Sequence, residues 1–346
     1  MTARAPRMGR PDAVRELTYW GRVRAKLVRD RLTLLASALL LFMITISLGA
    51  GWISDRLLGF SPTATNLRAR NQPPTWAEEA WPQFQAFTQT CQTEGGCDWS
   101  RWGEIMRSTR EGLRRCLTAG PGSCHWMGTD EAGRDVLARG LYGGRISLRI
   151  GVYVAAISLT LGVVVGLIAG YYAATWVDDL INAIIMTLNS IPLLFLLIIL
   201  SRIFTPGPEG LALLIGAFGW TGLARLIRGQ IFSLRERDFV LASRAVGSSP
   251  WRIMTRHVLP NVSSIVIVSA VFNVAGAIIA EAGLSYLGVG IGPPLPSWGN
   301  MMQGSLGNFT DAPWLVLAPG LFIFLTTLAI YLIGDGLRDA LDPWIR

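Results

Sequence analysis

The chain has 346 residues, of which 51% are hydrophobic and only 16% are charged. An average soluble chain carries about 25% charged residues, so this composition excludes a disordered chain, a coiled coil and a collagen-like fibre. The class that remains is an integral membrane protein with some polar segments outside the membrane. A net charge of +8 would suit a nucleic-acid binder, but basic residues that flank apolar segments explain it without nucleic acid.

Long apolar runs predict an all-α membrane protein with six transmembrane helices. The first run has 22 positions without a charge, and such a helix is about 33 Å long, enough for a hydrocarbon core of about 30 Å. The fourth run is short and glycine-rich, so it would also suit a buried or re-entrant segment. The predicted spans are residues 32–53, 150–173, 181–201, 210–224, 262–280 and 314–333.

The basic residues are unevenly distributed between the segments that flank these spans. Residues 1–31 contain nine Lys and Arg against three acids, and residues 222–260 contain seven Arg against two acids. Residues 54–146 are nearly balanced, with eleven Arg against ten acids. The positive-inside rule therefore places both termini and the 222–260 loop in the cytoplasm, and residues 54–146 outside. A cleavable signal peptide is the alternative for residues 1–53, but the apolar run exceeds the usual 7–15 residues, so we expect a retained anchor.

All four cysteines fall in the segment predicted to lie outside: Cys91, Cys97, Cys116 and Cys124. Thiols confined to an exported segment indicate disulfides in an oxidising compartment. Local pairs (Cys91–Cys97, Cys116–Cys124) and nested pairs (Cys91–Cys124, Cys97–Cys116) around a predicted helix over 99–117 are equally compatible with the spacing. A metal site is the weaker reading, because there is no C-x-x-C pair and His125 is the lone histidine nearby.

Motifs for catalysis are absent from the sequence. There is no G-x-x-x-x-G-K-[ST] phosphate loop, no H-E-x-x-H and no G-x-S-x-G. The two histidines, His125 and His257, are predicted to lie on opposite sides of the membrane. We therefore predict no catalytic residue, no metal site and no cofactor bound by this chain. If the protein drives an energy-consuming process, another chain must supply the nucleotide site.

Residues 234–260 predict a helix–turn–helix bracket outside the membrane. The first helix stops at Gly247, a good residue for a helix end, and Ser249 with Pro250 begins a second short helix that runs to Pro260. Apolar residues recur along the bracket between arginines, and a partner protein could bury them. The alternative is a helix that lies among lipid headgroups. Physical chemistry alone does not separate the two.

Four polar or helix-breaking residues within the predicted spans or at the end of one are candidates for a translocation pathway: Asn189, Pro192, Asn273 and Glu281. Asn189 and Pro192 could break a helix beside a pathway, although helix packing explains them and Asn273 equally well. Glu281 either lines the outer mouth or supports the loop 284–299, or it lies at headgroup depth and pairs with an arginine. Glycines spaced four apart (Gly162, Gly166, Gly170) predict a small-residue face for close helix packing.

The bracket resembles the EAA loop of ABC-importer permeases. Residues 238–247 (DFVLASRAVG), followed after nine residues by 257–260 (HVLP), match its pattern of E-A-A, three residues, Gly, nine residues, I-x-L-P. Ala242 keeps the middle position of that motif. Leu241 and Ser243 stand where Glu and the second Ala are common, and His257 stands at the Ile position.

Further stretches resemble the C-type subunit of dipeptide and oligopeptide permeases. Residues 125–147 carry an H-x-x-G-T-D-x-x-G-R-D signature, and residues 280–299 and 334–343 match the same family. The likeness covers about 125–346 and the N-terminal span, but leaves 60–124 unmatched. The signature residues, which we expect to fix this element through ion pairs and helix capping, are Gly128, Thr129, Asp130, Gly133, Arg134 and Asp135.

The resemblance implies a permease core over 147–346 that forms a pathway with a second homologous permease. Two ABC ATPase subunits would bind ATP and Mg and dock on the bracket, and a substrate-binding protein would deliver cargo from outside. The residues expected to couple to the ATPase, with Phe239, Trp251 and Met254 as anchors, are Asp238, Phe239, Ala242, Arg244, Gly247, Trp251, Met254, His257 and Pro260.

The resemblance further implies a multi-pass protein of a prokaryotic cytoplasmic membrane that contacts lipid and no nucleic acid. Its cargo would be di- or oligopeptides, with nickel complexes or sugars as alternatives. An ATP-independent channel or transporter is the rival reading, but such a protein has no need of an ATPase dock. A receptor would need a cytoplasmic output domain, and we find no such domain in the sequence. An intramembrane enzyme would need a second catalytic group beside Glu281, and none is evident.

Overall fold

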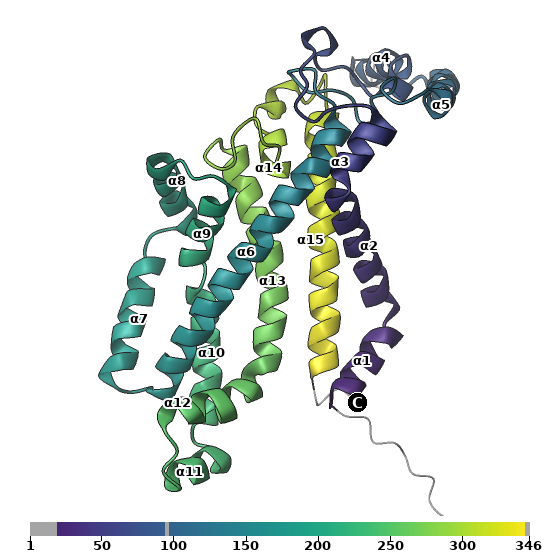
Figure 1. The fold of residues 1–346 in the computed structure, drawn as a ribbon. Helices are drawn as coiled ribbons and strands as arrows, with labels where there is room; N and C mark the ends of the chain where they lie inside the picture. Colours follow the sequence, from purple (N-terminus) through teal and green to yellow (C-terminus); the bar gives the residue numbers. More distant parts are fainter. Residues whose placement is uncertain (1–18, 94–96, 343–346) are drawn as a thin grey trace, which may run out of the picture.

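The computed structural model describes residues 19–93 and 97–342, and most of the basic segment 1–31 lies outside them (Figure 1). The described part is helical, with an isolated bridge between Thr129 and Asp135 as its β contact. Short 3-10 and π turns join the helices. The α-helices are α1 Tyr19–Arg29, α2 Arg31–Leu48, α3 Ala50–Trp52, α4 Ala80–Thr93, α5 Trp102–Thr118, α6 Val136–Tyr171, α7 Trp176–Asn189, α8 Leu193–Phe204, α9 Pro208–Phe218, α10 Thr221–Leu234, α11 Asp238–Ala245, α12 Pro250–Ile253, α13 Leu259–Tyr286, α14 Trp298–Met301 and α15 Trp314–Leu341.

The all-α membrane fold predicted from the sequence is confirmed. Five helical stretches in the described residues are long and apolar enough to cross a membrane, or six if α7 and α8 form one bent span. The predicted third span, 181–201, is not one helix, because α7 and α8 meet at an angle of 77°. Pro192 lies at this break, where a proline lacks the N–H of a continuing helix. The predicted fourth span, 210–224, is longer than expected and reaches from Pro208 to Leu234.

Helix α6 is the central element of the bundle and runs diagonally across it (Figure 1). It packs against α10, α13, α9 and α2. The predicted small-residue face of α6 packs against α10. A Cβ on Gly166 would be 2.8 Å from the carbonyl oxygen of Ala224, and one on Gly170 would be 2.6 Å from the Cβ of Ile231. Glycine is therefore required for the close approach of α6 and α10.

The two ends of the bundle carry different structures (Figure 1). At one end, called the insertion end, the segment between α3 and α6 folds into α4, α5 and connecting loops. Phe87, Ile105 and Ala80 form its small buried cluster. At the other end, called the bracket end, α11 and α12 project below the membrane helices. The candidate functional residues divide between these two ends and the bend between α7 and α8.

Candidate functional site

The bracket has the turn chemistry that its sequence predicts. Helix α11 ends before Gly247, whose φ of 78° lies in the left-handed region that favours glycine. Ser249 caps α12, with its Oγ accepting from the backbone N–H of Arg252 at 3.4 Å, and Pro250 occupies the first turn. A π turn over Met254–Val258 then leads into α13. The bracket is therefore a helix, a glycine turn and a second helix, continuous with the membrane helices.

One face of the bracket is buried against its own chain. Val240, Ile253 and Val258 are fully buried and pack in one cluster with Ile227 and Ile231 of α10. Met254 is 5% exposed and belongs to the same cluster. The expectation that Met254 anchors a partner is wrong, because this side chain holds the bracket against the membrane helices.

The opposite face of the bracket exposes apolar side chains. Val246 is 82% exposed and Trp251 64%, and Phe239 and Leu241 are each about 40% exposed. Among the other predicted coupling residues His257 is half-buried, and the exposed ones are Asp238, Ala242, Arg244, Gly247 and Pro260. Val246 and Leu241 were not among the predicted coupling residues, because a short apolar run does not show which of its members face inward. We call Phe239, Leu241, Val246 and Trp251 the outer face of the bracket.

Arginines tie the bracket end to the turn between α6 and α7. The guanidinium of Arg244 lies 5.6 Å from the ring centre of Tyr171, and Arg235 Nη1 donates to the carbonyl oxygen of Ala173 at 2.7 Å. Arg228 of α10 binds both carboxylate oxygens of Asp178 at 2.6 and 2.7 Å. The sequence did not predict the Asp178–Arg228 pair, because its members lie 50 residues apart. These contacts join α6, α7, α10 and α11 at one end of the bundle.

The bend between α7 and α8 brings two pathway candidates together. Asn189 and Pro192 line a cavity of about 190 Å³, and Thr221 lines it from the start of α10. Thr221 Oγ1 donates to Asn189 Oδ1 at 3.0 Å. Asn273 does not join this group, since its amide donates to the carbonyl oxygen of Ser269 in its own helix at 2.8 Å.

Glu281 serves the fold and does not line a pathway in this structure. It is fully buried and accepts hydrogen bonds from Ser147 Oγ at 2.8 Å and Ser285 Oγ at 2.7 Å. The same two hydroxyls accept from the backbone N–H groups of Trp298 and Ile291, at 3.4 and 2.9 Å. Glu281 thus joins α13, α6 and the loop before α14. Of its three proposed roles, support of the loop 284–299 agrees with these contacts, whereas lining the mouth and pairing with an arginine do not.

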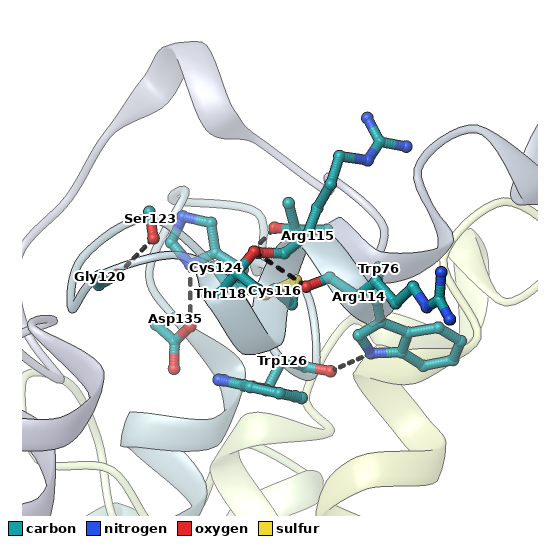
Figure 2. Close-up of a disulfide and its surroundings, with 12 residues drawn as sticks. Trp76, Arg114, Arg115, Cys116, Thr118, Gly120, Ser123, Cys124, Trp126 and Asp135 are labelled. Atoms are coloured by element: carbon teal, nitrogen blue, oxygen red, sulfur yellow. Dashed lines mark hydrogen bonds and ion pairs between the residues drawn. A yellow bond between two sulfur atoms is a disulfide. The ribbon is translucent and has the colours of Figure 1, made fainter. Parts of the chain in front are cut away.

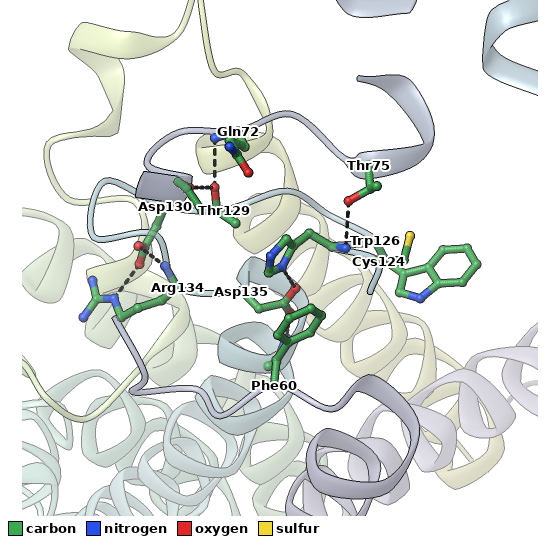
Figure 3. A network of polar contacts seen from close by, with 12 residues as sticks. Phe60, Gln72, Thr75, Cys124, Trp126, Thr129, Asp130, Arg134 and Asp135 are labelled. Atoms are coloured by element: carbon green, nitrogen blue, oxygen red, sulfur yellow. Dashed lines mark hydrogen bonds and ion pairs between the residues drawn. The ribbon is translucent and has the colours of Figure 1, made fainter. Parts of the chain in front are cut away.

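The signature at the insertion end forms a network of polar contacts (Figure 3). Asp130 binds Arg134 Nε at 2.7 Å and Arg139 Nε at 3.3 Å. Asp135 caps α6 by accepting from the N–H of Ala138 at 2.7 Å, and its other oxygen lies 2.8 Å from His125 Nδ1. These contacts fix the start of α6.

The same signature holds the segment that follows α3. Thr129 accepts from the backbone N–H of Gln72 at 2.8 Å and donates to the carbonyl oxygen of Ala69. Gly133 has a φ of 70°, and a Cβ there would lie 1.8 Å from the carbonyl oxygen of Asn66. Trp314 of α15 donates to the carbonyl oxygen of Thr129 at 3.1 Å. The geometry agrees with the structural role expected for the signature.

The cysteines pair locally, so the nested connectivity is wrong. Cys91 is bonded to Cys97, and Cys116 to Cys124. The second bond joins the end of α5 to the segment that leads into the signature, beside the hydrogen bond from Trp76 Nε1 to the carbonyl oxygen of Trp126 at 2.9 Å (Figure 2). With all four sulfurs bonded in pairs, the cysteines are not metal ligands in this structure. Among the residues described, no cluster of three or more His, Cys, Asp or Glu could hold a metal ion.

Most of the chain matches two families of transport proteins. Residues 162–346 match the family described as "Binding-protein-dependent transport system inner membrane component". Residues 18–74 match the "N-terminal TM domain of oligopeptide transport permease C". Together these matches include the bracket, the bend and the predicted spans, except residues 150–161 of the second span.

Curated relatives share about two-fifths of the aligned residues. The dipeptide transport system permease protein DppC of Alkalihalophilus pseudofirmus is 41% identical over 227 residues, 66% of this chain and 74% of that protein. The oligopeptide permease protein OppC of Mycobacterium bovis is 43% identical over 232 residues, 65% of this chain and 78% of the relative. The glutathione permease protein GsiD of Pectobacterium atrosepticum is 38% identical over 230 residues, 66% of this chain and 76% of the relative. A chain in a solved inward-facing structure of the MetNI methionine ABC transporter is also similar. The alignment covers 58% of this chain and 94% of that chain, at 18% identity and a TM-score of 0.46.

Proposed function

Because the chain belongs to the family of binding-protein-dependent transport system inner membrane components, we propose that it is one permease subunit of an ATP-driven importer of short peptides. It is a multi-pass inner-membrane protein. The relatives named above are permeases for dipeptides, oligopeptides and glutathione, and glutathione is itself a short peptide. These names support peptide cargo over the alternatives of nickel complexes and sugars.

The outer face of the bracket is the observation that carries this proposal. Trp251 and Val246 expose apolar surface in the basic 222–260 loop, which the positive-inside rule assigns to the cytoplasm. A cytoplasmic ATPase would bury these side chains as anchors, and the neighbouring Arg252 and Arg256 would form the polar rim. The opposite face is packed into α10, so a movement of the ATPase would reach the membrane helices directly.

The pathway would run beside the bend between α7 and α8. The bend leaves backbone groups near Asn189 and Pro192 outside regular helix, and irregular backbone at membrane depth is tolerated where it lines a cavity or is covered by protein. A second permease would close the other side of the pathway. ATP and Mg would be bound by the two ATPase subunits, with no cofactor on this chain, and a substrate-binding protein would dock at the insertion end.

Co-purification of the partner ATPase tests the coupling role. We expect tagged protein, co-expressed with its genomic neighbours, to recover a second permease and an ATPase in stoichiometric amounts. Trp251→Glu together with Val246→Glu should lose the ATPase and keep the second permease, because two charges would be buried at the dock. Trp99→Glu is the matched control, since Trp99 is 68% exposed at the opposite end.

Two results would count against this role of the bracket. If the double variant retains the ATPase at the wild-type ratio, the outer face does not form the dock. If wild-type protein is recovered without any ATPase in mild detergent, the outer face is a lipid-facing surface and the ATP-independent channel is the better reading.

A further inference from the structure

A large apolar groove lies between α2 and α6, apart from the bend. Its volume is about 930 Å³, and α13, α15 and the loop before α14 complete its walls. None of the residues that line the bend cavity lines this groove. Most of its lining is aliphatic, with Ile44, Val152 and Val274 as examples from three helices.

The polar groups of the groove include two arginines four residues apart on α6, Arg145 and Arg149. Arg145 donates to the carbonyl oxygen of Leu48 at 3.0 Å, and its guanidinium lies 5.7 Å from the ring centre of Tyr142. Arg149 pairs with Glu209 at 3.0 Å, but both side chains are about half exposed, so this pair is weak. The lining residues include no acidic side chain. The groove therefore has a positively charged end.

The charged end lies toward the insertion end, and the apolar part extends toward the middle of the bundle. Arg145 and Arg149 precede the apolar run 150–173, near the outer end of the span. From there the α2 wall runs from Leu48 to Leu40, a distance of about 12 Å along the helix axis. Ile330 of α15, which packs in one cluster with Leu40, lines the same groove. This depth approaches one leaflet of a hydrocarbon core that is about 30 Å thick.

We propose that this groove binds an anionic phospholipid, with the phosphate held by Arg145 and Arg149 and an acyl chain against the apolar walls. Guanidinium groups bind phosphate oxygens through charge-assisted hydrogen bonds. A peptide fits less well, because its backbone amides would find few partners along an aliphatic wall. A zwitterionic headgroup would bring an ammonium group that no acidic lining residue meets.

The bound lipid would fill the space between α2 and the rest of the bundle. Only 22% of α2 is buried within the described residues. An acyl chain in the groove would contact α2, α6 and α13 together, and would add packing that the protein side chains do not supply. The lipid would therefore hold the first span against the permease core.

Lipid retention by the purified complex tests this proposal without any transport assay. The full complex is incubated in detergent with phosphatidylglycerol, phosphatidylethanolamine or inorganic phosphate, and bound molecules are counted by native mass spectrometry. We expect phosphatidylglycerol to be retained preferentially, with about tenfold weaker binding in Arg145→Gln/Arg149→Gln, since two charge-assisted hydrogen bonds are lost. Arg110→Gln/Arg114→Gln on the exposed surface of α5 is the matched control and should retain lipid at the wild-type level.

A second variant keeps the arginines and fills the groove. Val152→Trp should displace the acyl chain, whereas Leu213→Trp should not, because Leu213 has a similar exposure on α9 and lies outside the groove. Equal phosphatidylglycerol retention in Val152→Trp and Leu213→Trp would overturn the proposal. Equal retention of the two lipids, or binding of inorganic phosphate in place of lipid, would also overturn it. Because the readout is bound lipid, the proposal stands or fails separately from peptide transport and from ATPase docking.

Discussion

The Asp178–Arg228 ion pair holds α7 against α10 at the bracket end. Asp178 is buried, with 4% of its side chain exposed, and its carboxylate accepts from Arg228, Asn182 and the N–H of Ala174. Arg228 is about one-third exposed. Loss of the arginine would leave a buried carboxylate without its cation, and that is more costly than loss of the whole pair.

Arg228→Gln should therefore lower the free energy of unfolding by about 3 kcal/mol, the lower end of the range for breaking a buried pair. Thermal unfolding of the purified protein in detergent measures this. Asp178→Asn/Arg228→Gln should recover a large part of the loss. Arg101→Gln, which breaks the exposed pair with Asp98, is the control and should change stability by less than about 1 kcal/mol. Equal effects of Arg228→Gln and Arg101→Gln would contradict the structural role.

Glu281 gives a second prediction at the residue scale. Glu281→Gln keeps an oxygen that can accept from Ser147 or Ser285, whereas Glu281→Leu leaves both hydroxyls without this acceptor. We expect the leucine variant to be less stable than the glutamine variant by about 1–3 kcal/mol. Limited proteolysis of the loop before α14 provides a local readout, because that loop should open in Glu281→Leu. A loop equally resistant in both variants would show that Glu281 does not hold it.

Residues governed by local rules were predictable from the sequence, and residues governed by distant partners were not. Gly247 and Pro250 follow from turn and capping preferences, which act within a few residues. Met254 was assigned to the wrong face of the bracket, because an apolar residue in a short helix suits either face. The partner of Asp178 depends on tertiary packing and has no signal in the local sequence.

At the scale of elements, the contact between α6 and α10 depends on three glycines. A Cβ on Gly166 would lie 2.8 Å from the Ala224 oxygen and 2.9 Å from the Ile227 Cβ, and neither atom belongs to a flexible chain end. The helices must therefore separate to admit even one methyl group. Since α10 leads into the bracket, their separation would also disturb the bracket end.

Gly166→Ala should thus destabilise the protein by about 1–3 kcal/mol, the usual cost of overpacking. Gly276→Ala on α13 is the matched control, because a Cβ there meets nothing within 4 Å. The control should be neutral or more stable, since alanine is the better helix former by about 1 kcal/mol. Thermal unfolding of both variants compares the two. Equal stability of the two variants would contradict the close approach of α6 and α10.

The sequence predicted which segments are apolar helices better than it predicted their continuity. Hydropathy marks residues that can lie in lipid, and each predicted span from 32 to 333 falls mainly in helices of the structure. It does not measure direction, so Pro192 indicated a possible break, but the angle of 77° became visible only in the structure. The disulfide connectivity also needed the structure, because spacing permits local and nested pairs alike.

At the scale of the whole molecule, this chain belongs to a family of transport-system membrane components, and we propose that it forms one side of the pathway. Its outer face on the bracket is an apolar surface that we expect an ATPase to cover, and its bend at α7 and α8 is open to a second permease. In this proposal, the second permease and the binding protein also contribute groups that select the cargo. Sequence and structure therefore define the type of transport protein more closely than they define its cargo.

The measurement that tests this account most directly is uptake of a labelled dipeptide by proteoliposomes that contain the full complex and its binding protein. We predict uptake that requires ATP, is competed by unlabelled peptides and not by nickel complexes or sugars, and is lost in Trp251→Glu/Val246→Glu. Peptide uptake that continues without ATP or without the ATPase subunits would contradict the account and support an ATP-independent channel.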